Sequence, residues 1–399
     1  MTTIDRPHHA SLASTATAGA IAMAVAMGFG RFSYTPILPA MMTDLGLSPA
    51  DAGLIASANF VGYLAGAVLG AYGWAHGQER RIGLASLAAT TLLLAAMGLT
   101  SSVLVLSLIR FLAGLASAFS MIFISGIVLG HGLLARSEHV PAMHFGGVGL
   151  GIAFSSLCVW LAPLAGAAGL SASQADWFTG ALVALVGTVV VALMLPAGPV
   201  SGNGAAREKP LTWTRPLTVV TLTYGLFGFG YVITATFLVA MARDASGGHS
   251  IEFLAWLLTG LSAALSVYLW RFAVPRFGLA GVYAIGLLAE AVGLVLTVSL
   301  PLPYAPLAGG LMLGATFMMI TAYGLQIGRH LAPESPRKAL ALMTAAFGIG
   351  QIIGPVVAGW LAQRTGSFAA PTLIAAAVLF VCGGVIVAEL RRIAAALPR

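Results

Sequence analysis

Residues 103–130 read VLVLSLIRFLAGLASAFSMIFISGIVLG, and Arg110 is the one charged side chain among them. A helix that crosses a bilayer needs about 20 consecutive apolar residues, so this stretch is long enough to span. Runs of the same kind fill the 399-residue chain, which is 59% hydrophobic and only 8% charged. A soluble globular protein carries about 25% charged residues. The composition therefore excludes a soluble enzyme, a disordered chain and a coiled coil, and it predicts a membrane protein.

The apolar runs between polar breaks predict twelve transmembrane helices. A spanning β-barrel would instead need alternating segments of about ten residues, whereas these runs are longer and uniformly apolar. The expected spans are 17–42, 52–75, 82–100, 103–130, 141–165, 174–195, 215–242, 251–273, 279–300, 303–328, 338–363 and 368–390.

The lysines and arginines predict which side each loop faces, because cytoplasmic loops are enriched in them. With the N-terminus inside, 15 of the 19 fall in cytoplasmic segments, and only Arg243 and Arg364 fall in outer ones. We therefore expect a multi-pass protein of the bacterial inner membrane with both termini in the cytoplasm. The net charge of +7 is spread over helix ends rather than gathered in one basic patch, so nucleic acid is not an expected partner.

The chain divides at residues 196–214, PAGPVSGNGAAREKPLTWT, whose Pro, Gly, Ser and charged residues are typical of a linker. We expect a cytoplasmic tail over 1–16, a six-helix bundle over 17–195, the linker, and a second six-helix bundle over 215–399. The halves are related, because Gly28-Phe29-Gly30 and Trp160-Leu161-Ala162 recur 200 residues later as Gly228-Phe229-Gly230 and Trp360-Leu361-Ala362. The fourth span also matches the tenth at an offset of 198. The sequence therefore indicates a duplicated six-helix unit.

Two parallel six-helix repeats joined by a cytoplasmic linker resemble the layout of the major facilitator superfamily (MFS) of transporters. Arg110-x-x-x-Gly114 resembles the arginine motif of this family in span four, and Gly28-Phe29-Gly30-Arg31-Phe32 looks like its bacterial YbfB/YjiJ-like subgroup. The family signature between spans two and three is degenerate, since Trp74 stands where an aspartate is expected. The resemblance implies an all-α membrane protein of twelve helices in two six-helix bundles, working by alternating access.

Arg31 lies near the middle of the first span. A bare arginine at that depth costs about 2.5–3.5 kcal/mol on the insertion scale, so it should face a partner or water. Tyr34 and Thr35 share its helix face. One interpretation is a cavity-facing cation whose guanidinium fork holds an anionic group of the substrate. The alternative is a structural arginine bonded to backbone carbonyls that Pro36 leaves without partners.

Other polar residues lie on spans that line the central cavity in the family that the chain resembles. Each alone is typical of an interhelical hydrogen bond, but as a set they predict a pocket that is mixed rather than wholly apolar. With Arg31, Tyr34 and Thr35, the predicted substrate-binding residues are Asn59, Tyr63, Tyr231, Tyr323, Gln326 and Gln351, of which Tyr231 is the repeat counterpart of Arg31.

Three residues are candidates for coupling transport to protons. Glu290 is the only acid near the membrane centre, and the alternative for it is a role in helix packing. His144 could carry protons near neutral pH, although a lone histidine is more often a hydrogen-bond spacer. The resemblance gives Arg110 a role either in coupling or in packing spans one, two and four.

The predicted function is transport of a small molecule with an anionic group, with protons as the candidate coupling ion. Efflux of amphipathic drugs or sugars is the alternative within transport, and a non-transporting membrane receptor is the alternative from another class. Motifs of enzymes and nucleotide sites such as GxxxxGK[ST], GxSxG, HExxH and CxxC do not occur. We therefore expect no catalytic residues, no cofactor and no metal, and a monomer in the lipid bilayer.

The charge distribution generates a test of topology. Single cysteines at Ser201 and Ser48, in a background without the two native cysteines, should react with a membrane-impermeant reagent from the inside and the outside respectively. The reversed pattern would overturn the predicted orientation.

Overall fold

The computed structural model describes residues 11–72, 74, 76–137, 139–162, 169–198 and 208–398. Residues 1–10 of the predicted tail and 199–207 of the predicted linker lie outside these ranges. Within the described ranges, 12 helices are long and apolar enough to cross a membrane. Each of them overlaps one predicted span, so the prediction of a twelve-helix membrane protein is confirmed.

Two of the first six spans begin at a capping box. Ser48 and Asp51 form a capping box at the start of the second span, and Ser171 and Gln174 form one at the start of the sixth. The elements are α1 (Leu12–Met23), η1 (Ala24–Phe32), α2 (Tyr34–Leu45), α3 (Pro49–Gly70), α4 (Glu79–Met97), α5 (Val103–Leu134), α6 (His139–Leu161) and α7 (Ala172–Met194). The first three together make one span, in which η1 is a π-helical segment.

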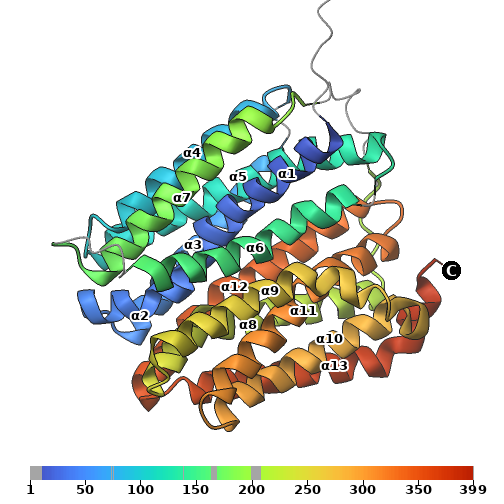
Figure 1. Ribbon diagram of the computed structural model, residues 1–399. Coiled ribbons are helices and arrows are strands. Elements are labelled where there is room, and N and C mark those ends of the chain that lie inside the picture. The colour runs from blue at the N-terminus through green and yellow to red at the C-terminus, as the bar shows by residue number, and fades with distance from the viewer. Residues whose placement is uncertain are drawn as a thin grey trace, which may run out of the picture.

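The second six spans form a separate group of helices beside the first (Figure 1). They are α8 (Arg215–Asp244), α9 (Gly248–Trp270), α10 (Val274–Ser299), α11 (Tyr304–Leu331), α12 (Pro336–Thr365) and α13 (Ala369–Ala396). The repeat extends to the turns, because Gly46 after α2 and Ser246 after α8 both have a left-handed backbone, with φ of 64° and 62°. A left-handed residue commonly ends a helix.

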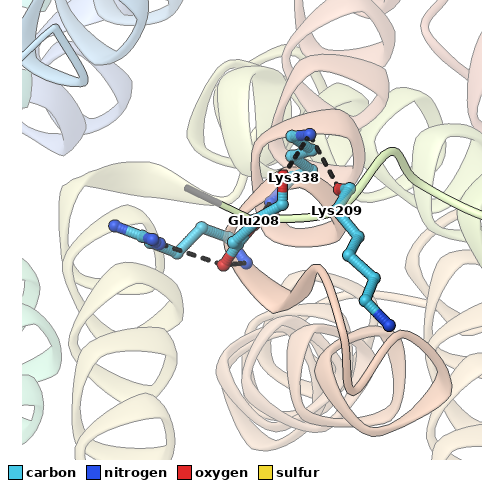
Figure 2. A network of polar contacts seen from close by, with 4 residues as sticks. Glu208, Lys209 and Lys338 are labelled. Carbon is cyan, nitrogen blue, oxygen red and sulfur yellow. Dashed lines mark hydrogen bonds and ion pairs between the residues drawn. The ribbon is translucent and has the colours of Figure 1, made fainter. Parts of the chain in front are cut away.

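Residues Glu208 and Lys209, just before α8, are tied to the start of α12 (Figure 2). The Glu208 carboxylate accepts hydrogen bonds from the backbone N–H groups of Arg337 at 3.0 Å and Lys338 at 3.1 Å. Lys338 Nζ donates back to the carbonyls of Glu208 and Lys209, and Lys209 pairs with Glu334 at 2.8 Å. Desolvation raises the pKa of Glu208, but these hydrogen bonds outweigh it and hold the pKa below its ordinary value. This segment is therefore attached to the second half of the molecule.

The two halves meet through three helix pairs, α6 with α9, α3 with α12, and α2 with α8. We call the end of the molecule with the short turns after α2, α8 and α12 the turn end, and the opposite end, with residues 208–214, the linker end. Glycines let the backbones touch between the halves. A Cβ atom on Gly149 of α6 would lie 2.6 Å from the Gly260 carbonyl oxygen and 2.7 Å from Ala264 Cα of α9. Larger residues at this crossing would force the halves apart.

Three hydroxyl groups bridge the halves in the part of each span that leads to the turn end. Thr35 donates to the Ala235 carbonyl at 2.5 Å, Ser57 to that of Ile352 at 2.7 Å, and Ser156 to that of Phe253 at 2.9 Å. Trp160 also stacks on Phe253, with ring centroids 5.0 Å apart. The halves are thus closed against each other at the turn end.

Candidate functional site

Arg31 lies at the end of η1, and its side chain is buried, with 5% of the residue exposed. Its guanidinium carbon is 4.5 Å from the ring centroid of Tyr63, 4.7 Å from that of Phe60 and 5.4 Å from that of Phe32. Cation–π contacts of this kind attract the charge without satisfying its N–H donors. Among the described residues, Arg31 Nε and Nη2 have no hydrogen-bond partner.

Carboxylates do not compensate the charge of Arg31 in the part of the chain that the structure describes. The ion pairs found there lie at helix ends or on the segment before α8, and none includes Arg31. One of them, between Arg243 and Glu252 at 2.6 Å, lies at the turn end. Arg31 is therefore a buried cation that keeps unused donors.

Arg110 of α5 is bonded to the backbone of the first span. Its Nη1 donates to the Gly30 carbonyl at 3.1 Å and its Nη2 to the Arg31 carbonyl at 3.0 Å. In π-helical geometry the Arg31 carbonyl would accept from the residue five positions on, which is Pro36 and has no N–H. Arg110 supplies the missing donor. The structural role weighed for Arg31 in the sequence is thus performed by Arg110.

Tyr231 of α8 lies in a group of rings from the second half, which we call the aromatic cluster, made of Phe227, Tyr231, Phe317 and Phe347. Tyr231 is nearly parallel to Phe317, with centroids 5.7 Å apart and planes at 3°, and to Phe347, at 5.6 Å and 6°. Its hydroxyl accepts a hydrogen bond from Gln351 Nε2 of α12. Two predicted site residues, Tyr231 and Gln351, are thereby brought into contact.

The aromatic cluster touches the surroundings of Arg31 directly. Phe32, the residue after Arg31, meets Phe317 edge to face with centroids 6.0 Å apart. Tyr63, which lies against Arg31, is partly exposed, and its hydroxyl donates to Met121 Sδ at 2.9 Å. Arg31 and Tyr63 from the first half and Tyr231 and Gln351 from the second therefore line a common region where the halves meet.

Three other predicted site residues of the first half are used in packing. Tyr34 donates its hydroxyl to the Ala52 carbonyl at 2.9 Å, and its ring lies 4.9 Å from the Arg110 guanidinium. Asn59 Nδ2 donates to the Arg110 carbonyl at 3.0 Å, where α3 packs on α5. Thr35 makes the inter-half bond to Ala235 described above. Each of these three side chains donates to a backbone carbonyl of another helix.

The remaining predicted binding residues lie on α11, nearer the linker end. Tyr323 donates to the Val267 carbonyl of α9 at 3.4 Å, which is a contact within the second half. The Gln326 side chain is exposed. Both residues follow Phe317 on the same helix, in the direction that leads away from the aromatic cluster.

The two titratable coupling candidates are each buried inside one half. Glu290 of α10 is fully buried, accepts a hydrogen bond from the Thr316 hydroxyl of α11 on Oε2, and has no partner on Oε1 among the described residues. His144 of α6 is also fully buried, with its Nε2 2.7 Å from the Ser125 hydroxyl of α5. A Cβ atom on Gly19 would lie 2.7 Å from His144 Nδ1, so this imidazole fills the contact between α6 and α1.

Sequence reasoning missed the aromatic part of the site, namely Phe60, Phe317 and Phe347. An apolar ring in an apolar helix carries no signal of its own. The one available hint was the spacing of Phe227 and Tyr231, which places two rings on one face of the seventh span.

Comparison with known proteins agrees with this architecture. The profile of the family described as "Uncharacterised MFS-type transporter YbfB" matches residues 23–387. The chain belongs to this family of MFS transporters. It is therefore a transporter and not an enzyme, and the predicted resemblance is confirmed. No curated protein matches the sequence significantly.

Solved structures of other MFS transporters share the fold of this transporter. The nucleoside transporter NupG is 16% identical with a TM-score of 0.72, covering 95% of this chain and 99% of the other. A bacterial homologue of the human lysosomal transporter Spinster, inward-facing and occupied, is 12% identical with a TM-score of 0.75, covering 97% and 98%. A bacterial homologue of the human drug peptide transporters is 13% identical, with a TM-score of 0.73, covering 96% and 99%. At these identities, the likeness shows the fold alone.

The bonds of Arg110 predict that the two mid-membrane arginines differ in their effect on stability. Arg110→Gln should lower the melting temperature of the purified protein, because two buried carbonyls lose a charged donor at about 1–3 kcal/mol each. Arg31→Gln is the matched control, since it removes the same charge without taking a donor from a carbonyl, and it should melt at or above the wild-type temperature. Equal destabilisation by the two substitutions would contradict the assignment of the structural role to Arg110.

Proposed function

We propose that this MFS transporter moves a small organic molecule with an anionic group across the bacterial inner membrane, and that Arg31 binds this group. The observation that carries the proposal is the pair of unpartnered donors, Nε and Nη2, on a buried guanidinium. Arg31 also lies near the middle of the first span, and MFS transporters bind substrate near the membrane midplane.

Electrostatics gives the proposal a physical basis. A buried charge without a partner carries a desolvation penalty that a hydrogen-bonded counterion offsets. The guanidinium presents a planar fork that suits a carboxylate, and Nε and Nη2 lie along one side of that fork. A carboxylate bound there would neutralise Arg31 and satisfy both donors in one step.

Alternating access explains how the substrate would reach Arg31. We propose that the linker end faces the cytoplasm, as the distribution of basic residues predicts, so that the closed turn end faces outward. Tyr63 and Phe347 are both partly exposed. Along α3 and α12, these residues lie on the linker-end side of Ser57 and Ile352, whose bond joins the halves. In this orientation the substrate would approach from the cytoplasmic side, between α3 and α12.

Glu290 is the residue that we propose for proton coupling. It is buried, and its Oε1 has no partner among the described residues. Its bond to Thr316 joins it to the residue that precedes Phe317 of the aromatic cluster. Protonation of Glu290 would therefore act on the helix segment that carries part of the binding region. Arg110 and His144, by contrast, are bonded within the first half.

Substrate binding by Arg31 variants tests the proposed function. Arg31→Lys keeps the charge but loses the planar fork, so affinity for the anion should fall about tenfold or more, and Arg31→Gln should lose binding almost completely. The measurement is the dissociation constant of each purified variant, with folding checked by size-exclusion chromatography. Unchanged affinity in a well-folded Gln variant would make Arg31 structural and favour transport of a neutral drug or sugar.

A second prediction concerns coupling. Glu290→Gln keeps the shape of the side chain but cannot release a proton. In proteoliposomes it should abolish accumulation driven by a pH gradient and leave exchange of substrate between the two sides intact. Normal accumulation by this variant would refute the coupling role and leave Glu290 as a packing residue.

A further inference from the structure

The aromatic cluster is a set of stacked rings beside Arg31. Tyr231, Phe317 and Phe347 come from α8, α11 and α12, and the planes of the last two are within 6° of the plane of Tyr231. Three different helices therefore hold these rings in one common orientation. Stacked and edge-to-face ring pairs contribute beyond the apolar area that they bury, which corresponds to about a tenfold gain in affinity at most per pair.

A ring from the first half, that of Phe32, already contacts Phe317 of this cluster. Phe32 follows Arg31 in the chain and contacts Phe317 edge to face, with planes at 63°. The space lined by Phe32, Tyr231, Trp256 and Phe317 has no room for a water molecule while the halves are closed here. When the halves separate, Phe32 leaves with the first half and Phe317 loses this contact. A planar ligand could then replace the edge contact with a stacked one.

The cationic groups of this region can neutralise only one negative charge on a ligand. Arg31 has two unused donors on one side of its fork, whereas Arg110 has only Nε unused, because both its Nη atoms are taken by the carbonyls of Gly30 and Arg31. Within the described residues, the two lysines of the chain, Lys209 and Lys338, are bonded at the start of α12, far along the chain from this region. A second anionic group would therefore be buried without a partner, which is strongly unfavourable.

We propose that the substrate is an aromatic monocarboxylate, a planar ring that carries one carboxylate group. The carboxylate binds Arg31 Nε and Nη2 in the first half, and the ring stacks on Phe317 in the second, in the place of Phe32. This inference rests on the proposed function, since it assumes that Arg31 binds the anionic group. A substrate of this shape contacts both halves at once, so it is suited to a site that forms between them.

The test compares four probes with the purified full-length protein. Benzoate is the planar monoanion, cyclohexanecarboxylate keeps the charge and size without the aromatic ring, benzamide keeps the ring without the charge, and terephthalate adds a second charge. We expect benzoate to bind about tenfold more tightly than cyclohexanecarboxylate, and at least about tenfold more tightly than benzamide and terephthalate. Equal affinities for benzoate and cyclohexanecarboxylate, or no binding of benzoate to the folded protein, would overturn the proposal.

Variants test the ring contact and the anion contact separately. Phe317→Leu should reduce the preference for benzoate over cyclohexanecarboxylate to about onefold, while Phe380→Leu, a matched change at an exposed position of α13, should keep it. Arg31→Gln should abolish binding of both carboxylates. If benzoate and cyclohexanecarboxylate bind the wild-type protein equally and Arg31→Gln abolishes binding of both, the aromatic inference fails and the anion site stands. If neither depends on Arg31, the proposed function fails as well. The comparison of probes on the wild-type protein decides the matter even if Phe317→Leu does not fold.

Discussion

The membrane interior leaves no water to satisfy polar groups, and this constraint governs the two arginines at the centre of the first half. Arg110 meets it by donating to the carbonyls of Gly30 and Arg31 near the end of the π-helical segment. Arg31 meets it only in part, because ring faces attract its charge while its Nε and Nη2 have no acceptor among the described residues. One arginine therefore stabilises the fold, and the other keeps the donors that a ligand would use.

The polar groups between the halves also need partners in place of water, and the hydrogen bonds that they make can be broken and re-formed. Thr35, Ser57 and Ser156 each donate a hydroxyl to a carbonyl of the opposite half. Such hydroxyls can turn back to a carbonyl of their own helix when the halves part, as several others in this protein do, Thr90 among them. Separation would then leave none of these three hydroxyls without an acceptor. Glycine contacts and hydroxyl bonds are thus well suited to an interface that opens and closes.

Helix number and approximate helix ends were predictable, because span length depends only on local composition. The duplicated organisation was predictable because residues recur at an offset of 200. The predicted site was predictable in part. Arg31 with Tyr63, and Tyr231 with Gln351, lie together, whereas Tyr34 and Asn59 are used in helix packing. The reason is that membrane helices are apolar on every face, so the sequence does not tell which way a polar side chain is rotated. The bonds of Arg110 depend on π-helical geometry, and Pro36 is the one local feature of the sequence that indicated it.

The central claim is that the unused donors of Arg31 bind a carboxylate where the halves meet. A crystal structure of the protein with 4-bromobenzoate tests it most directly, because anomalous scattering locates the bromine without ambiguity. The account predicts carboxylate oxygens at about 3 Å from Arg31 Nε and Nη2, with the bromine on the side of Tyr231 and Phe317. A ligand bound elsewhere, or an Arg31 whose Nε and Nη2 make no hydrogen bond to the bound ligand, would contradict it.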